Sequence, residues 1–136
     1  MKYQNNQLWS ECQLVSIWNA RRFWGLDAPR MGTKEYEKIC KQFHCISGAC
    51  LGLRKDPESF GIKRINGGRN LRWIKKNLPV EIGIYCHRGY HSVLIVDYKG
   101  DKLLLTNYAR GRTHWIEWIK LKNRIVREHP RSFQKI

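Results

Sequence analysis

Cys12, His91 and Asn107 are the residues of this chain whose types and order could support nucleophilic chemistry. Cys12 opens the segment CQLVSIWNARRFWG, which has helical spacing, and a thiol at a helix N-terminus is biased toward the reactive thiolate. An imidazole beside the thiol would act as general base, and an amide would orient the imidazole. These parts fit acyl transfer, in which a thiolate attacks a carbonyl carbon.

The same chemistry needs a hydrogen-bond donor for the oxyanion that forms. Asn6 and Gln7 precede Cys12 closely, and either side-chain amide could donate together with the backbone N–H of Cys12. Each residue also has a structural interpretation, since cysteines are often buried as small apolar residues. The prediction therefore depends on the conjunction of the residues and their order, not on any one of them.

The elements that must position these residues begin with helices. Apolar residues at helical spacing predict a helix from Cys12 that ends near Gly25. Further helical segments are predicted from Thr33, just before Gly61, and from Asn70 to the residues preceding Pro79.

The second half of the chain has the pattern of strands. Alternating and continuous apolar runs predict strands at 80–85, 91–98 and 102–107, and 113–121 reads as a strand or as a strand running into a helical turn. Helices followed by strands predict one α+β domain over residues 1–136, with N-terminal helices packed on a C-terminal antiparallel sheet. The basic tail after about residue 123 is expected to be partly mobile.

The hairpin predicted between the last two of these strands relates His91 to Asn107. If the loop comprises residues 98–100, an antiparallel ladder places the two opposite each other, about 4.5–5.5 Å apart at Cβ. A two-residue loop would instead place His91 opposite Tyr108. His91 opens its strand and Asn107 closes the next, so both are expected at one end of the sheet.

The order of these parts resembles that of the papain-like cysteine peptidases, and the likeness is closer to the small double-glycine peptidases of bacteriocin exporters and their stand-alone relatives. The segment similar to their nucleophile helix is SECQLVSIWNARRFWG. The segment similar to their His-bearing hairpin is LPVEIGIYCHRGYHSVLIVDYKGDKLLLTNYARGRTHWIEWIKL. The resemblance covers residues 7–121, with only element order matching over 26–79, and it implies a papain-like fold.

The resemblance also implies roles for residues and a substrate class. Cys12 would be the nucleophile, His91 the general base, and Asn107 the orienting residue, where the exporter peptidases usually have Asp and papain has Asn. The family's oxyanion Gln lies six residues before the Cys, which is Asn6 here, with Gln7 one step nearer. The expected activity is hydrolysis of a peptide or related amide bond in a peptide or protein substrate.

The charge of the chain suggests a second kind of partner. Twenty-six Lys and Arg face 11 Asp and Glu, for a net charge of +15, and such a surface attracts polyanions. No acid occurs between Glu58 and Glu81. The residues predicted there to bind a polyanion are Arg69, Arg72, Lys75 and Lys76. A catalytically idle papain-like domain that binds nucleic acid or protein through this surface is the alternative to the hydrolase.

Several other classes of protein fit the sequence poorly. No apolar run is long enough for a membrane span, and the N-terminus has no signal-peptide character. Five cysteines without framework spacing favour a reducing compartment, so a cytoplasmic protein is expected. The glycines of INGGRN lack the Lys-Ser/Thr of a phosphate loop, and no cofactor is expected.

Two further groups of residues were weighed as sites. Cys40, His44, Cys45 and Cys50 have zinc-ligand chemistry. However, they lack the usual C-x2-C pair, so core packing is the preferred interpretation and no metal is predicted. Cys86 is the alternative nucleophile for His91, but it does not stand at a helix N-terminus.

Overall fold

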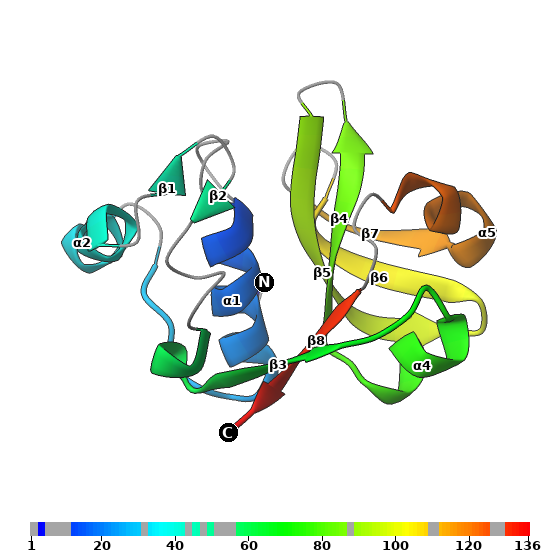
Figure 1. Ribbon diagram of the computed structural model, residues 1–136, viewed down its shortest axis with the longest axis horizontal. Helices are drawn as coiled ribbons and strands as arrows, with labels where there is room; N and C mark the ends of the chain where they lie inside the picture. The colour runs from blue at the N-terminus through cyan, green and yellow to red at the C-terminus, as the bar shows by residue number, and fades with distance from the viewer. Residues whose placement is uncertain are drawn as a thin grey trace.

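Helices occupy mainly the first part of the chain and strands the second (Figure 1). The computed structural model describes residues 3–4, 12–30, 33–42, 45–46, 49–50, 57–86, 89–108, 112–125 and 130–136. The elements in chain order are α1 (Cys12–Phe23), α2 (Lys34–Gln42), β1 (Cys45–Ile46), β2 (Ala49–Cys50), η2 (Pro57–Phe60), β3 (Ile62–Asn66), α4 (Leu71–Lys76), β4 (Val80–Cys86), β5 (Gly89–Lys99), β6 (Lys102–Tyr108), β7 (Arg112–Glu117), α5 (Trp118–Leu121), η4 (Lys122–Arg124) and β8 (Arg131–Lys135). The architecture is α+β with an open antiparallel sheet, as the sequence predicted.

The predicted helix boundaries are confirmed by their caps. α1 ends before Gly25, which has φ +73° and so adopts the left-handed conformation that commonly follows a helix. The Thr33 hydroxyl accepts a hydrogen bond from the backbone N–H of Tyr36, 3.2 Å away, at the start of α2. Asn70 caps α4 in the same way, since its side chain accepts from Trp73 N at 3.1 Å.

The large sheet has the strand order β3-β8-β4-β5-β6-β7, and every neighbouring pair is antiparallel. The C-terminal segment, expected to be partly mobile, instead supplies β8, which lies between β3 and β4. Phe133 pairs with Arg64 of β3, and Ser132 pairs with Val80 of β4. Both Ser132 and Phe133 are buried. Strands β3 and β8 were not predicted from the sequence.

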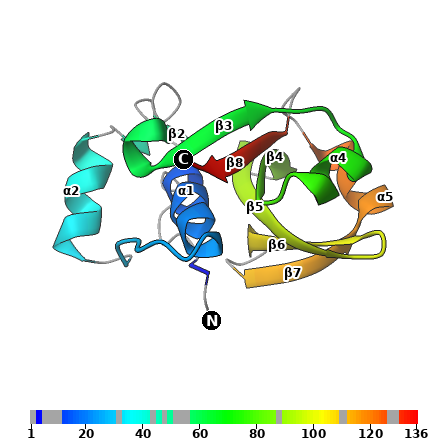
Figure 2. The same ribbon diagram turned by 90° about the horizontal axis from the view of Figure 1, so that it is seen from below.

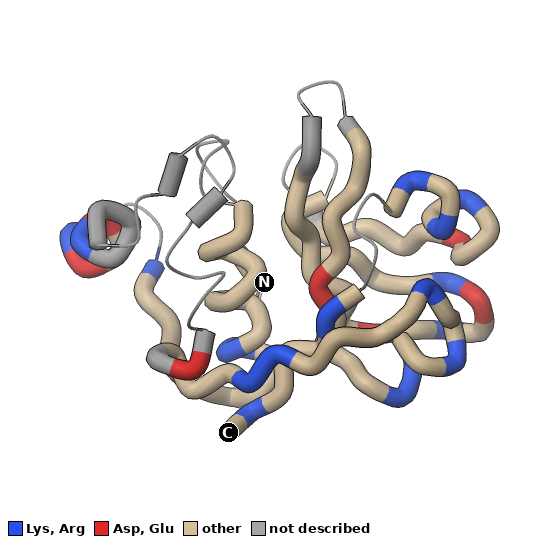
Figure 3. Tube along the Cα trace, viewed as in Figure 1, with Lys and Arg blue, Asp and Glu red and all other residues tan. Residues whose placement is uncertain are grey.

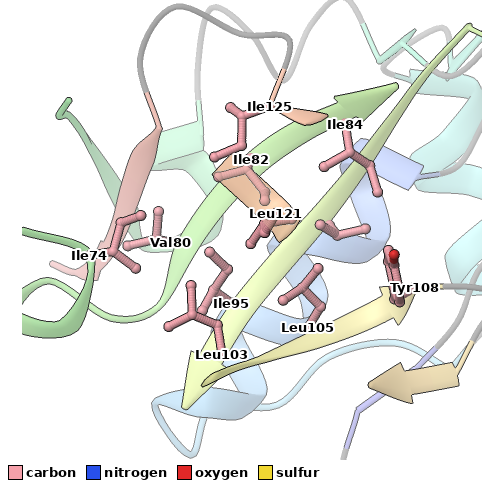
Figure 4. Close-up of a cluster of buried hydrophobic side chains, with 11 residues drawn as sticks. Ile74, Val80, Ile82, Ile84, Ile95, Leu103, Leu105, Tyr108, Leu121 and Ile125 are labelled. Carbon is pink, nitrogen blue, oxygen red and sulfur yellow. The ribbon is translucent and has the colours of Figure 1, made fainter. Parts of the chain in front are cut away.

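α1 lies on one side of the large sheet, and α4 and α5 lie on the other (Figure 2). Each face of the sheet carries its own apolar core. On one face α1 packs through Leu14, Ile17 and Trp18 against Leu94 and Val96 of β5. On the other face α4 and α5 cover the sheet. The core there, drawn in Figure 4, comprises Ile74, Val80, Ile82, Ile84, Val93, Ile95, Leu103, Leu105, Tyr108, Leu121 and Ile125. Because side chains alternate along a strand, β5 contributes to both cores.

Among the residues described, no helix has the length and apolar character needed to cross a membrane.

Gly67 offers a test of the packing between the loop after β3 and α4. A Cβ at Gly67 would lie 2.2 Å from ring atoms of Trp73, whereas a Cβ at Gly68 would meet no atom within 4 Å. We expect Gly67→Ala to lower the free energy of unfolding by about 1–3 kcal/mol through overpacking, and Gly68→Ala to change it by less than about 0.5 kcal/mol. Urea denaturation of both variants measures the difference, and equal stabilities would contradict this contact.

Candidate active site

Cys12 is the first residue of α1 and is buried, with 1% of its surface exposed. The first backbone N–H groups of a helix have no partner within the helix, and Cys12 is the residue at which α1 begins. Partial positive charge at this end favours the thiolate form. The position of Cys12 therefore suits a nucleophile as well as a residue of the core.

His91 lies near the start of β5 and makes a short contact with β6. Its Nε2 is 2.5 Å from the backbone oxygen of Asn107. A carbonyl oxygen can only accept a hydrogen bond, so Nε2 carries the proton and donates it. In the neutral imidazole the free lone pair is then on Nδ1, so Nδ1 is the atom that can accept a proton from another group.

Burial also prepares His91 to act as a base. Desolvation lowers the pKa of His91 below its ordinary value, and the hydrogen bond to Asn107, which acts in the opposite direction, is the smaller cause. At neutral pH the imidazole is therefore mainly unprotonated. A general base must be in this form to accept a proton.

The Asn107 backbone oxygen contacts His91, and the sequence predicted the side-chain amide of Asn107 as the orienting group. Asn107 is buried, with 1% exposed, and has φ +55°, the one positive φ at a non-glycine among the described residues. Asparagine tolerates this left-handed conformation better than most residues. The residue with this left-handed backbone conformation, at the end of β6, is the same residue whose carbonyl contacts the imidazole.

The register of the β5–β6 hairpin differs from both registers predicted from the sequence. Lys99 pairs with Lys102, so the turn contains two residues and not the three of the first prediction. Gly100, the first residue of the turn, has φ +60°, as a type II′ turn requires at that position. The prediction of a three-residue loop is wrong because this glycine permits the tighter turn.

The position of the turn, at Gly100 and Asp101, also overturns the second prediction, and a β-bulge then moves the pairing back by one residue. β5 carries one extra residue at Val96, and beyond it the ladder pairs Leu94 with Thr106. Continuing that ladder places Asn107 two residues away from the point opposite His91. The two residues meet because the imidazole reaches the main chain of β6, not because their side chains lie opposite each other.

A buried hydrogen bond joins α1 to β5 close to both candidate catalytic residues. The hydroxyl oxygens of Ser16 and Ser92 are 2.9 Å apart. Ser16 lies one helical turn after Cys12, and Ser92 directly follows His91. In Figure 1 the Cys12 end of α1 and the Gly89 end of β5 are turned toward the same side of the molecule.

This hydrogen bond is part of a hydrogen-bonded network that was not predicted from the sequence. The Ser92 hydroxyl donates to Glu81 Oε2 at 2.8 Å, and because a hydroxyl has one proton, Ser16 must donate to Ser92. Glu81 is 4% exposed, and its Oε1 lies 3.9 Å from a guanidinium nitrogen of Arg131. The sequence did contain a signal of this buried network, because Glu81 is an acid within the otherwise apolar run VEIGIY.

Asn19 makes a second polar link on the same helix. Its side chain accepts from Gln4 N at 2.7 Å and donates to Gln4 O at 2.8 Å. It also donates to the Thr106 hydroxyl at 3.3 Å. The N-terminal segment, α1 and β6 are therefore joined one residue before Asn107.

Asn107→Gly and Asn107→Ala form a matched pair of variants for the backbone role of this residue. Both remove the amide, but only glycine accepts φ +55° without strain. We expect Asn107→Ala to be about 1 kcal/mol less stable than Asn107→Gly, with the His91 contact kept in the glycine variant. Thermal melting and the reactivity of the Cys12 thiol in both variants check this. Equal losses in the two variants, relative to the unaltered protein, would assign the role to the side-chain amide.

Some of the predicted site residues lie outside the described part of the chain. These are both oxyanion candidates, Asn6 and Gln7, together with His44 of the group considered for zinc. The side chains of the remaining cysteines, including Cys86, are likewise not described. Among the described residues no group of three or more His, Cys, Asp and Glu is arranged to hold a metal ion.

The predicted polyanion-binding residues lie on a different face from Cys12. Arg69, Arg72 and Lys76 are exposed in and before α4, on the face of the sheet opposite α1. Lys75 is half-buried, with its Nζ 3.7 Å from the carboxylate of Asp101 and 5.2 Å from the centre of the Tyr98 ring. The structure thus places these basic residues away from Cys12.

No protein-family model matches the sequence, and no curated protein matches it.

Proposed function

We propose that this chain is a papain-like cysteine hydrolase that cleaves a peptide or related amide bond. The observation that carries the proposal is the Nε2 contact of His91 with the Asn107 carbonyl. It fixes the tautomer that leaves Nδ1 as base, on the strand that a buried hydrogen bond joins to the Cys12 helix. An oriented neutral imidazole and a thiol at a helix N-terminus are the parts that this reaction needs.

The reaction follows from these parts. His91 Nδ1 takes the proton of the Cys12 thiol, and the thiolate attacks the carbonyl carbon to form a tetrahedral oxyanion. The backbone N–H of Cys12, with Gln7 or Asn6, donates to that oxyanion. The imidazolium then protonates the leaving amine as the C–N bond breaks, which gives a thioester with Cys12.

Water completes the cycle at the same residues. His91 Nδ1 removes a proton from the water that attacks the thioester carbonyl, and the carboxylic acid leaves as the C–S bond breaks. The Asn107 carbonyl stabilises the imidazolium that forms in each half-reaction. The reaction uses no cofactor and no metal, and in this proposal the enzyme works in the cytoplasm on a peptide or protein.

The rate at which iodoacetamide labels Cys12 as a function of pH tests the proposal. Mass spectrometry of the Cys12 peptide separates this thiol from the other cysteines. We expect an apparent pKa at least about one unit below the roughly 8.5 of a free thiol. His91→Ala should raise this pKa and slow labelling at neutral pH, because the thiol loses its base.

His114→Ala is the control, since His114 is exposed on β7 and contacts only the Tyr108 ring among the described aromatic residues. It should label like the unaltered protein. Slow labelling that is the same in the unaltered protein and in both variants would show that Cys12 and His91 do not form a pair, and the hydrolase proposal would fail.

A further inference from the structure

The end of the sheet remote from His91 gathers basic residues from three separate segments. α4, the β5–β6 turn and the α5–η4 segment meet there, since Lys75 pairs with Asp101 and Trp118 N donates to Asp101 O at 2.8 Å. We call this surface the hairpin-end face. Its basic residues are Arg69, Arg72, Lys75, Lys76, Lys99, Lys102, Lys120 and Lys122, and its acids are Asp101 and Glu117.

In Figure 3, Lys and Arg positions follow α4, the β5–β6 turn and α5, on the side of the molecule away from α1. Lys99 lies eight residues along β5 from His91, which corresponds to roughly 25 Å at 3.3 Å per residue. A ligand on the hairpin-end face would therefore not occupy the candidate active site. The excess of positive charge on this face matches a polyanion.

A groove of about 820 Å³ lies on this face between the β5–β6 turn and α5. Lys99, Lys102 and Lys122 line it together with Trp118, which is half-buried. Lysines beside an aromatic ring are the combination with which proteins bind single strands, because lysines follow the phosphates and a ring stacks on bases.

The two acids in the groove help to choose between polyanions. Asp101 and Glu117 are exposed and line it with the lysines. They would repel an acidic peptide, whose side chains carry negative charge throughout. A nucleic acid has its charge on the backbone and has amino groups on its bases, and carboxylates accept hydrogen bonds from such groups.

We propose that this groove binds single-stranded nucleic acid, with Lys99, Lys102 and Lys122 on the phosphates and Trp118 on a base. The inference is independent of the hydrolase, because no residue of the hairpin-end face belongs to the Cys–His pair. The variant Cys12→Ala should accordingly bind the same strand with unchanged affinity.

The first test measures fluorescence anisotropy of a labelled DNA strand of about 20 nucleotides at salt concentrations from about 50 to 200 mM. The test variant carries Lys99→Gln, Lys102→Gln and Lys122→Gln. The control carries Lys34→Gln, Lys38→Gln and Lys63→Gln, which are exposed on α2 and β3 and give the same net charge. We expect at least about tenfold weaker binding in the test variant only, with the log–log salt slope shallower by about 2.

Equal losses in the two triple variants would mean that overall charge, not the groove, holds the strand, and would overturn the proposal. Absence of salt-dependent binding by the unaltered protein would overturn it as well. Each variant is compared with the unaltered protein by thermal melting, so that a folding defect is recognised.

A second test separates a single strand from a duplex. Trp118→Phe keeps an aromatic ring and Trp118→Leu keeps only apolar volume. We expect the leucine variant to bind the single strand about tenfold more weakly than the phenylalanine variant. A duplex of the same length should bind more weakly than the strand. Tighter binding of the duplex, with no difference between the Trp118 variants, would contradict a single-strand site.

Discussion

Replacing Cys12 with alanine is expected to abolish amide hydrolysis by this protein while leaving it folded. The thioester forms on the Cys12 sulfur, and no step of the proposed reaction proceeds without it. Loss of the nucleophile in a triad costs about 10⁴-fold or more in kcat, because the remaining groups do not act independently. The smaller side chain at this buried position is expected to cost about 1 kcal/mol of stability.

Hydrolysis of a mixed peptide library, followed by mass spectrometry, measures this effect without knowledge of the natural substrate. Cys86→Ala is the matched control, because Cys86 is the alternative nucleophile that His91 could deprotonate. Cys86 lies on β4 and not at the start of a helix. We expect Cys86→Ala to keep full activity. Activity that survives Cys12→Ala and disappears in Cys86→Ala would transfer the nucleophile to the strand.

The helices and most strands could be predicted because their signals are local. The start of α4, for example, is predicted by its N-cap residue Asn70, whose side chain accepts a hydrogen bond from Trp73 N. The continuous apolar runs of β5 and β6 reflect strands with apolar packing on both faces, whereas β4 alternates and contributes apolar residues only to the core beneath α4 and α5. A residue's own neighbours in sequence were sufficient for these elements.

β3 and β8 could not be predicted because their sequences, IKRIN and RSFQK, carry few apolar residues. β8 is a strand through its partners, since it pairs with residues far away in the sequence on both sides. Its burial depends mainly on Phe133 and Ser132. The basic character of the segment suggested a mobile tail, and tertiary pairing overrides such a local signal.

The relation of His91 to Asn107 shows a different limit of the sequence. Counting along a ladder requires the exact position of the turn and assumes that no residue bulges. The turn lies at Gly100 and Asp101, later than the loop predicted at residues 98–100, and the extra residue at Val96 changes the count again. The contact itself nevertheless exists, through a backbone oxygen that every residue possesses. The sequence thus identified the two positions, whereas the group that makes the contact depends on the φ of Asn107.

Replacing Glu81 with alanine is expected to produce the largest loss of stability among single substitutions in the polar core of this fold. The carboxylate accepts the Ser92 hydroxyl at 2.8 Å and faces the Arg131 guanidinium, and Glu81 is 4% exposed. Alanine leaves the Ser92 proton and the Arg131 charge without this acceptor. Because Arg131 is partly exposed, the main loss is the charged acceptor of the buried Ser92 hydroxyl, which costs about 2–3 kcal/mol.

Glu81→Gln is the comparison that isolates the charge. The glutamine amide oxygen can still accept from Ser92, and Arg131 is partly exposed, so water can solvate its charge. We expect this variant to lose only about 1 kcal/mol. Urea denaturation curves, whose midpoints shift with stability at constant slope, give both values. Similar small losses for alanine and glutamine would show that the buried carboxylate is not the centre of this network.

The same variants connect stability to the candidate active site. Through Ser92 and Ser16, Glu81 links α1 to β5. Ser16 lies one helical turn after Cys12, and Ser92 directly follows His91. If that link positions the thiol for the imidazole, Glu81→Ala should slow labelling of Cys12 at neutral pH even where the protein is fully folded. Glu81→Gln should label nearly as fast as the unaltered protein. Identical labelling in the folded alanine variant would confine the network to stability, with the Cys12 helix held by its apolar packing on Leu94 and Val96.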